Sequence, residues 1–363
     1  MHGHEGAAVR RAHRDSGSQL EPPSPYDRTE REVDEDARLA PGATRSRGAG
    51  HRAAPEEPDP ARTCFERDRD RILHGTTAFR RLAGKTQVFI FPEDHQRTRL
   101  THALEVTQVA TSIARACRLN VALTEAIALG HDCGHGPGGH ASEDAFSPFL
   151  PDGYDHAVWG ADVVLAPLNL CAETLDGVRN HSWSRPAPAT PEGEVVSWAD
   201  RIAYVCHDFE DAAHVGIVSP SDLPDEVREL CGTPRREQLH AFITAVVAAT
   251  TRTGVIGMDE GPADALAAFR RFNYERIYMR PESVTQAGQV ITVLRALVEH
   301  YAGDPAGLPS DARPPDLDSG TDEAVRAAIT YVGGMTDRYA FGQAIALLDW
   351  DPTQLPRGVD FRS

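Results

Sequence analysis

The sequence predicts a mainly α-helical fold, and three observations support this prediction. Apolar residues recur at intervals of three and four positions in many segments, which places them on one face of a helix. The alternation of apolar and polar residues that marks a half-buried strand is scarce, and residues 88–91 are the best short candidate. Hydrophobic residues make up 40% and charged residues 25% of the 363 residues, which suffices for one large domain or two small ones.

Residues 1–60 differ from the rest of the chain. They are rich in Arg, Glu, Asp, Pro, Gly and Ala, and they lack periodic apolar positions. Such a segment buries too little apolar surface to offset the entropy lost on ordering. We therefore expect a disordered N-terminal extension, or one that becomes ordered only against another subunit.

Helical spacing begins near residue 64. Residues 66–81 place apolar side chains between charges, and residues 101–119 repeat the pattern. Residues 122–131 form a third expected helix, which the glycines at 134 and 136 end. The further expected helices are residues 158–170, 195–214, 236–250, 263–274, 324–331 and 339–348. Residues 307–322, rich in Pro, Asp and Ser, are an expected loop.

The charge balance limits the class of partner. With 37 basic and 54 acidic residues, the chain has a formal net charge of −17. Most of its surface should repel nucleic-acid backbones. The composition therefore favours a small substrate over a long polymer, and a phosphorylated one would need a local basic pocket.

Cysteine usage and hydropathy indicate the compartment. The six cysteines contain no C-x-x-C pair, which argues against a structural zinc site and against a disulfide framework. Free thiols suit the reducing cytoplasm, where we expect the protein. No apolar run approaches the roughly 20 residues that span a bilayer, and residues 241–251 suit a core helix. The N-terminal arginines precede no apolar stretch, so we expect no secretory signal.

The densest group of reactive side chains lies at residues 131–140, which hold three histidines and one aspartate. Imidazole nitrogen and carboxylate oxygen together suit a divalent transition metal. His131 and Asp132 are adjacent, so on one helix their side chains point about 100° apart. They can converge on one ion only if it lies at the end of the helix.

Two more residues complete a candidate ligand set, His102 on the preceding expected helix and Asp200 on a later one. Helices packed side by side bring such residues onto one ion in bundle proteins. Two His and two Asp leave coordination positions for water and a substrate oxygen, as a catalytic site requires. A single helical histidine is weak evidence, but the combination predicts a divalent metal site for Mg, Mn, Fe, Co, Ni or Zn.

A competing motif lies in the same segment. Gly134, Gly136 and Gly139 match the dinucleotide fingerprint G-x-G-x-x-G. That fingerprint needs a strand before it, and here a helix is expected. We interpret the glycines as allowing a sharp turn that brings His135 and His140 back toward the metal.

Several motifs in order resemble the HD superfamily of metal-dependent phosphohydrolases, and within it the dGTPase-like deoxynucleoside triphosphate (dNTP) triphosphohydrolases. The resemblance implies an HD-domain helical phosphohydrolase fold with the metal site between helices. It implies an HD core at residues 61–215 and a helical region at 216–363 that completes the pocket and forms an oligomer interface. The motifs span about residues 64–345 and are residues 67–74, 79–88, 97–102, 131–140, 200–204 with 207–208, and 334–339.

The resemblance implies a reaction, the hydrolysis of dGTP or another dNTP to the deoxynucleoside and inorganic triphosphate. His102, His131, Asp132 and Asp200 match the family's metal ligands. His140 matches the histidine beside the scissile bond, which suits a general acid for the 5′-oxygen.

Three further residues match the region around His140. Glu143, one helical turn after His140, is expected to orient it and raise its pKa. His135 and His156 match active-site histidines that contact phosphates. The alternative for His156 is a surface residue in a loop.

Phosphate charge requires cationic partners. Arg99 matches an arginine one turn before the first metal ligand and can bind phosphate through two nitrogens. Arg201 stands where some relatives carry lysine and many carry aspartate. It is therefore either a phosphate ligand or part of a solvated helix face.

The sugar subsite follows from the same resemblance. Tyr204 and Asp208 lie four and eight residues after Asp200, near one helix face. Tyr204 resembles a sugar-stacking residue and Asp208 accompanies it. Gln87 matches the residue that senses the 3′-hydroxyl, with Val88 beside it.

The chain departs from its relatives at Cys133 and Gly138, where bulkier apolar residues are common, so the loop is looser or suited to another substrate. Residues 181–185 either line the pocket or form a structural elbow. The rival functions are an HD-type nucleotidase or phosphodiesterase and a non-catalytic dNTP-sensing protein. The resemblance also implies a homo-oligomer and an allosteric dNTP. No membrane partner is expected, and the only role expected for nucleic acid is that of a regulator.

Overall fold

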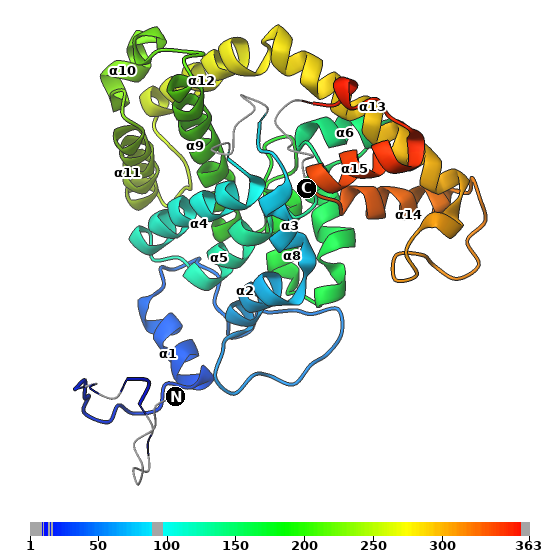
Figure 1. Ribbon diagram of the computed structural model, residues 1–363. Coiled ribbons are helices and arrows are strands. Elements are labelled where there is room, and N and C mark those ends of the chain that lie inside the picture. The colour runs from blue at the N-terminus through cyan, green and yellow to red at the C-terminus, as the bar shows by residue number, and fades with distance from the viewer. Residues whose placement is uncertain (1–8, 10, 14, 16, 89–96, 357–363) are drawn as a thin grey trace.

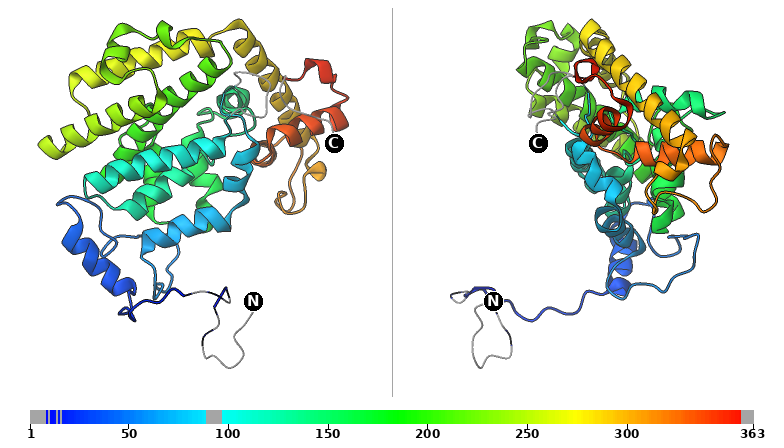
Figure 2. Two further views of the ribbon diagram at one scale, coloured as in Figure 1. Left: turned by 60° about the vertical axis from the view of Figure 1, so that its left-hand side comes forward. Right: turned by 45° about the vertical axis from the view of Figure 1, so that its right-hand side comes forward.

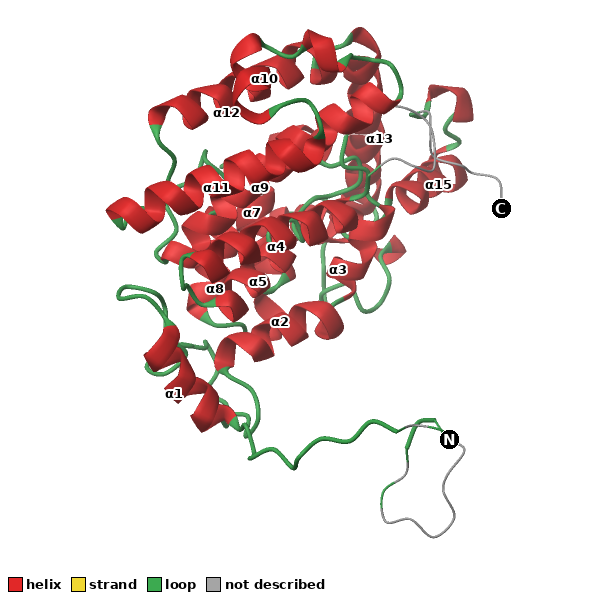
Figure 3. Ribbon diagram, turned by 90° about the vertical axis from the view of Figure 1, so that its left-hand side faces the viewer, coloured by secondary structure: helices red, strands yellow, loops and turns green. Residues whose placement is uncertain are grey.

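The computed structural model describes residues 9, 11–13, 15, 17–88 and 97–356, and helices dominate these ranges (Figures 1 and 3). They contain no strand and only two isolated β-bridges, Arg52–Cys171 and Thr86–Thr98. The predicted mainly α-helical fold is confirmed. The strand candidate at residues 88–91 lies outside the described residues except for Val88, which is not in a strand.

The α-helices in these ranges are α1 (Arg28–Arg38), α2 (Cys64–Gly75), α3 (Thr77–Arg81), α4 (Arg99–Ala116), α5 (Val121–Gly130), α6 (His140–Phe146), α7 (His156–Trp159), α8 (Ala172–Asn180), α9 (Pro191–His214), α10 (Asp225–Cys231), α11 (Arg235–Thr253), α12 (Glu260–Asn273), α13 (Pro281–Gly303), α14 (Asp322–Gly333) and α15 (Asp337–Leu348). The shorter turns are η1 (Leu82–Gly84), η2 (Ser147–Phe149), η3 (Gly160–Val164), η4 (Ala166–Leu168), η5 (Pro220–Asp222), η6 (Tyr274–Tyr278), η7 (Pro305–Gly307) and η8 (Pro352–Gln354).

Helices α4, α5 and α9 pack against one another at the centre of the molecule, with α2 and α8 beside α5 and α11 beside α9 (Figure 2, left). Their shared core is apolar and dry, and Val109, Ile127 and Ile202 in it are fully buried. A rigid core of this kind fixes the side chains that project from its helices. Burial of apolar area at about 25 cal/mol per Å² is the dominant stabilising contribution.

A second apolar cluster joins α6 to α13, α14 and α15, on the right of Figure 1. Phe146, Val290, Leu294 and Phe341 are fully buried in it. The sequence analysis did not predict α13, because β-branched residues and Gly288 give this segment low intrinsic helix propensity. Burial of one face against α6 and α14 offsets that weakness.

Two expected helices are interrupted. Residues 66–81 split into α2 and α3 at Thr76, whose hydroxyl caps α3 by accepting from Ala78 N. Residues 158–170 split into α7, the π-helical turn η3 and the short turn η4, which contains Pro167. Proline cannot donate within a helix, and periodicity alone did not reveal the break.

The N-terminal segment contains α1, which the expectation of disorder did not include. A capping box formed by Asp27 and Glu30 begins the helix. The buried Glu192 then accepts hydrogen bonds from Thr44 N at 3.1 Å and from Thr44 Oγ1 at 2.7 Å. In the structure, polar hydrogen bonds join this segment to the chain's own core, where apolar periodicity gave no signal.

No helix within the described ranges is both long enough and apolar enough to cross a membrane.

Candidate metal centre

Three core helices supply the four predicted metal ligands. His102 lies one turn into α4, which Thr98 begins by accepting a hydrogen bond from Thr101 N. His131 and Asp132 lie in the turn directly after α5, and Asp200 lies in α9. Because α4, α5 and α9 pack together, all four side chains point into one space.

The distances within this group are short. Asp200 Oδ1 lies 3.0 Å from His102 Nε2 and 3.8 Å from His131 Nε2. Asp132 Oδ1 lies 3.5 Å from His131 Nε2. The structure thus brings together the four residues that the sequence singled out, and their ligand role stays a prediction.

His131 shows that the group suits a metal ion. Its Nδ1–H donates to the carbonyl of Ala128 at 2.7 Å, so Nε2 carries the lone pair. This Nε2 is buried and has no hydrogen-bond partner among the described residues. A buried acceptor without a donor is costly, and an ion held with the carboxylates of Asp132 and Asp200 would offset that cost. The residues present can therefore hold a divalent metal.

Electrostatics keep both carboxylates ionised. Burial raises the pKa of Asp132, but Arg99 and the neighbouring histidines bring it well below its usual range. Arg99 Nη1 donates to Asp132 Oδ2 at 3.0 Å, and both side chains are buried. Burial likewise raises the pKa of Asp200, but its hydrogen bond with His102 and the nearby His131, His102 and His181 rings together lower this pKa below its ordinary value.

A second group of histidines adjoins the first. The rings of His135 and His156 stack with centroids 3.7 Å apart, and His135 Nε2 lies 3.3 Å from Asp132 Oδ1. His140 receives a hydrogen bond at Nδ1 from Arg99 Nη2 at 3.0 Å, so its own proton lies on Nε2. The predicted return of the glycine-rich segment toward the metal ligands is therefore seen in the structure.

Glu143 has a different partner from the one we expected. Its Oε1 accepts from the backbone N of His156 at 3.0 Å and from His156 Nδ1 at 2.8 Å. Burial lowers the pKa of His156, but Glu143 raises it above its ordinary value. Surrounding protein and then Arg99 lower the pKa of His140 to about 4, although the side chain is exposed and Glu143 opposes the shift. Among the described residues, Arg99 makes the hydrogen bond to the His140 ring. Glu143 acts on the pKa of His140 in the expected direction, but burial and Arg99 outweigh it. Its role in orienting His140 stays a prediction.

His181 also lies in this centre, and the sequence did not fix its place there. Its Nδ1–H donates to Val178 O at 2.8 Å, which leaves Nε2 as the acceptor for His156 Nε2–H at 3.2 Å. The ligand atoms of His131, Asp132 and His181 also lie within 4.8 Å of one another. His181 follows α8 directly, and no spacing rule connects it with the distant ligands.

The glycines of the loop are required by close approach. Gly138 and Gly139 have φ of +71° and +61°, which side chains rarely adopt. A β-carbon on Gly139 would lie 2.5 Å from Arg99 Nη2, and one on Gly134 would lie 1.9 Å from His156 O. The preceding element is the helix α5 and not a strand, so the dinucleotide reading is excluded as predicted.

The C-terminal region fastens this loop from outside. Asp337 accepts from Gly138 N and from Thr86 N, each at 2.8 Å. The buried Lys85 donates to the carbonyls of Gly333, at 2.8 Å, and His135. Burial lowers the pKa of Lys85 to about 8. The sequence analysis assigned no role to Lys85 or Asp337, since only the fold brings them to the loop.

The predicted phosphate and sugar residues have distinct surroundings. Gln87 is buried, and its Oε1 has no partner among the described residues. Val88 packs on the core beside it. Tyr204 accepts a hydrogen bond from Arg270 Nε at 2.9 Å. Asp208 accepts one from Tyr278 OH at 2.5 Å, and burial raises the pKa of Asp208 to about 6.

Arg201 is not simply part of a solvated face. Its Cζ lies 3.7 Å from the centroid of the Trp183 ring and 6.0 Å from that of Tyr204. The Nε atom of Arg201 is buried and has no hydrogen-bond partner among the described residues. Burial lowers the pKa of the Arg201 guanidinium. Trp183 is fixed in turn by donating to Ser197 O at 3.1 Å. The aromatic faces thus hold a guanidinium that has no ion-paired carboxylate among the described residues.

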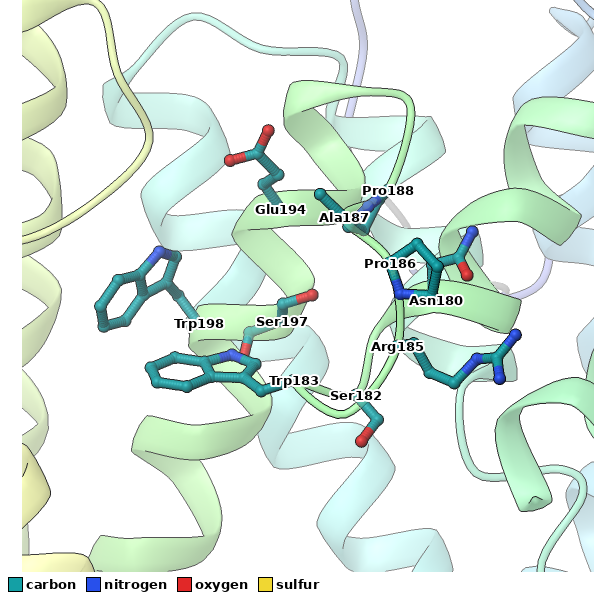
Figure 4. Close-up of a pocket in the computed structure, with 10 residues that line it drawn as sticks. All are labelled: Asn180, Ser182, Trp183, Arg185, Pro186, Ala187, Pro188, Glu194, Ser197 and Trp198. Carbon is teal, nitrogen blue, oxygen red and sulfur yellow. The ribbon is translucent and has the colours of Figure 1, made fainter. Parts of the chain in front are cut away.

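Residues 181–185 do border a hollow. It encloses about 270 Å³, and Trp183 and Trp198 stand together at one end with ring centroids 4.9 Å apart (Figure 4). Arg201 lies against the Trp183 ring, so that ring belongs both to the hollow and to the support of Arg201. The lining residues are Asn180, Ser182, Trp183, Arg185, Pro186, Ala187, Pro188, Glu194, Ser197 and Trp198.

Comparisons with known proteins agree with this arrangement. Residues 99–205 match the HD domain, and residues 256–344 match the phosphohydrolase-associated domain. The first range contains all four candidate ligands, and the second contains Asp337.

Three curated relatives are each named deoxyguanosinetriphosphate triphosphohydrolase-like protein. That of Caldanaerobacter subterraneus subsp. tengcongensis is 39% identical over 310 residues, which are 83% of this chain and 90% of that protein. That of Clostridium perfringens strain SM101 is 39% identical over 305 residues, 78% of this chain and 86% of that protein. That of Desulfatibacillum aliphaticivorans is 36% identical over 324 residues, 83% and 92% respectively.

With the ligand geometry, both domain matches and this coverage, the chain belongs to the deoxyguanosinetriphosphate triphosphohydrolase-like family of HD-domain phosphohydrolases.

Proposed function

We propose that the protein hydrolyses dNTPs, dGTP or another, to the deoxynucleoside and inorganic triphosphate. The observation that carries the proposal is the convergence of His102, His131, Asp132 and Asp200, with a buried His131 nitrogen that lacks a partner. These four residues would hold a divalent metal. The printed names of the relatives support the substrate class.

In this reaction the oxygen of water bonds to the α-phosphorus, and the bond from that phosphorus to the 5′-oxygen breaks. The 5′-oxygen takes up a proton, so triphosphate leaves whole. When bound, a divalent metal supplies Lewis acidity toward a phosphoryl oxygen. The rest of the transition-state charge falls to the protein's own cations.

Arg99 and Arg201 are the proposed phosphate ligands. Arg99 is oriented by Asp132 and by His140. Arg201 is held by the Trp183 face. The Nε atoms of both guanidiniums are buried without a partner among the described residues, which suits a polyanionic ligand.

His140 is the proposed general acid, with a role that depends on substrate. With a pKa of about 4 it is neutral at neutral pH, and it carries one proton on Nε2. The negative charge of a bound triphosphate favours the protonated ring. His156, whose pKa Glu143 raises against the effect of burial, and the neighbouring His135 would contact the phosphates.

Gln87 supports the choice of a sugar-bearing substrate. Its buried Oε1, which has no partner within the described ranges, is an acceptor suited to the 3′-hydroxyl. Val88, Tyr204 and Asp208 are proposed to complete the sugar subsite.

We further propose that residues 216–363 complete the pocket and form the interface of a homo-oligomer, with residues 61–215 as the catalytic core. The hydrogen bond that Asp337 accepts from Gly138 N in the glycine-rich loop supports the first part. An allosteric dNTP and a cytoplasmic location belong to the same proposal.

A panel of dNTPs with identified products, repeated with different divalent metals, tests the function. Triphosphate and deoxynucleoside are the expected products. Release of orthophosphate or pyrophosphate would indicate the rival nucleotidase or phosphodiesterase activity. Binding without turnover for every dNTP, alone and mixed, would indicate a dNTP sensor.

A further inference from the structure

Two thiols far apart in sequence meet outside the metal centre. Cys64 is the first residue of α2, and Cys171, 107 residues later, immediately precedes α8. Both are free cysteines. A hydrogen bond with the Cys64 thiol, and then burial, raise the pKa of the Cys171 thiol. Sγ of Cys171 also lies 4.0 Å from the carbonyl oxygen of Cys64, so the two cysteines are neighbours in the fold.

One buried ion pair holds the backbone of both cysteines. Arg52 Nη1 lies 2.7 Å from Asp68 Oδ1, and Asp68 is fully buried. Arg52 Nη2 also donates to the carbonyl of Cys64 at 3.0 Å, while Asp68 Oδ2 accepts from Cys171 N at 2.8 Å. The two positions are thus fixed by the same pair of side chains.

Gly50 leaves room for the sulfurs. A β-carbon on Gly50 would lie 2.7 Å from Sγ of Cys64 and 3.6 Å from Sγ of Cys171. Its φ of +78° also disfavours any side chain. Both sulfurs therefore border one small space, and the N-terminal segment passes over this space at Gly50.

We propose that Cys64 and Cys171 are a modification site, a reversible disulfide that fastens α2 to α8. The oxidant is a hydroperoxide. Cys64 is partly exposed and reacts first, whereas Cys171 is fully buried.

The steps balance as two electrons and two protons. The Cys64 sulfur attacks one peroxide oxygen, the O–O bond breaks, and water leaves from hydrogen peroxide, which gives a sulfenic acid. The Cys171 sulfur then attacks the Cys64 sulfur, the S–O bond breaks, and a second water leaves with the Cys171 proton. A low-molecular-weight thiol reverses the reaction by exchange.

The covalent link limits the unfolded chain, because it closes a loop between residues 64 and 171. Closing a loop of this length raises stability by restricting the denatured ensemble. We expect oxidation to raise the melting temperature by about 5 °C. The metal ligands are not part of the link, so this inference does not depend on the proposed substrate.

The test treats the full chain with hydrogen peroxide, blocks free thiols with N-ethylmaleimide and maps peptides by mass spectrometry without reduction. A peptide pair joining Cys64 to Cys171 is expected, together with the rise in melting temperature, and dithiothreitol should reverse both. Cys117→Ser is the matched control, since Cys117 is buried beside Thr250 and should leave the response intact.

Cys171→Ser should abolish the temperature rise and leave a Cys64 sulfenic acid that dimedone traps. Two results would overturn the inference: oxidised Cys64 in the wild type without the linked peptide, or a full temperature rise in Cys171→Ser. The peptide map of the wild type decides the matter even if a variant fails to fold.

Discussion

Two buried polar groups in the same helical core differ in how their atoms are satisfied. Glu192, at the start of α9, is fully buried and accepts from Thr44 N, Thr44 Oγ1 and Asn120 N, at 3.1, 2.7 and 2.9 Å. In the metal centre, eight residues further along the same helix, Asp200 faces imidazoles, and His131 Nε2 has no partner among the described residues.

The pKa values of the carboxyl groups follow the same division. Burial raises the pKa of Glu192 despite its hydrogen bonds, whereas the pKa values of Asp132 and Asp200 lie below their ordinary values. A carboxylate saturated by neutral donors fastens the chain to itself. Carboxylates kept charged beside unsatisfied lone pairs are prepared for a cation.

The largest expected effect is at Asp200. Asp200→Ala removes the ligand contributed by α9, so we expect loss of bound metal and a fall of about ten-thousandfold in dNTP hydrolysis, or ~5 kcal/mol of transition-state stabilisation. Metal analysis and steady-state kinetics measure both. Glu192→Gln is the control and should retain its metal. Full metal content and activity in Asp200→Ala would disprove the four-ligand set.

A substitution at Glu192 tests the carboxylate that is satisfied by hydrogen bonds. Glu192→Ala leaves the N–H groups of Thr44 and Asn120 buried without an acceptor, and we expect a loss of about 4 kcal/mol in the free energy of unfolding. Urea denaturation measures it. Glu192→Gln, which keeps one acceptor oxygen, should lose less. A change in metal content per folded molecule would show that the two groups are not separate.

Asp208 lies between the two cases, with one donor and a pKa raised to about 6 by burial. Between pH 3.8, its ordinary value, and pH 6 the folded protein holds a proton that the unfolded chain has released. Stability from this group is therefore greatest at low pH and falls by about 3 kcal/mol as the pH rises through this window. The free energy of unfolding is measured against pH for the wild type and for Asp208→Asn. The variant should lack this pH-dependent component, so the two curves should differ by it. An unchanged slope would mean that the pKa of Asp208 is not raised in the folded protein.

The smallest effect is expected beside the centre, at Trp183. Trp183→Ala removes the ring under Arg201, and we expect KM for a dNTP to rise about fivefold while kcat stays within about twofold, as loss of a cation–π contact of about 1 kcal/mol implies. Trp183→Phe should keep most of the affinity. Trp198→Ala is the matched control, because Trp198 touches the hollow and Trp183. An equal rise in KM for Trp198→Ala would assign the effect to the hollow instead of Arg201.

The sequence predicted much of the core and the ligand set, because both depend on local patterns. Helical periodicity marked α4, α5 and α9, and the H, HD and D positions lie on or directly after those helices. Helical periodicity did not reveal α13 or α1. Helix α13 forms through burial of its apolar face. Helix α1 forms where polar caps and hydrogen bonds to the core replace apolar contacts.

Polar contacts between residues far apart in the chain were the other feature that the sequence did not predict. The pairing of Glu143 with His156, and of Arg99 with His140, depends on which side chains the loop brings together. The thiol contact between Cys64 and Cys171 joins positions 107 residues apart, and no spacing rule relates them. Such contacts are set by the packed fold and not by neighbours in the chain.

The hydrogen bonds of Asp337 have a consequence for synthesis on the ribosome. Gly138 N and Thr86 N are paired only when residue 337 has left the exit tunnel, although the metal ligands are complete by residue 200. We expect a nascent chain to gather its histidines and aspartates early and to fix its glycine-rich loop only after residue 337 is exposed. Activity would then report a chain that has been synthesised through residue 337.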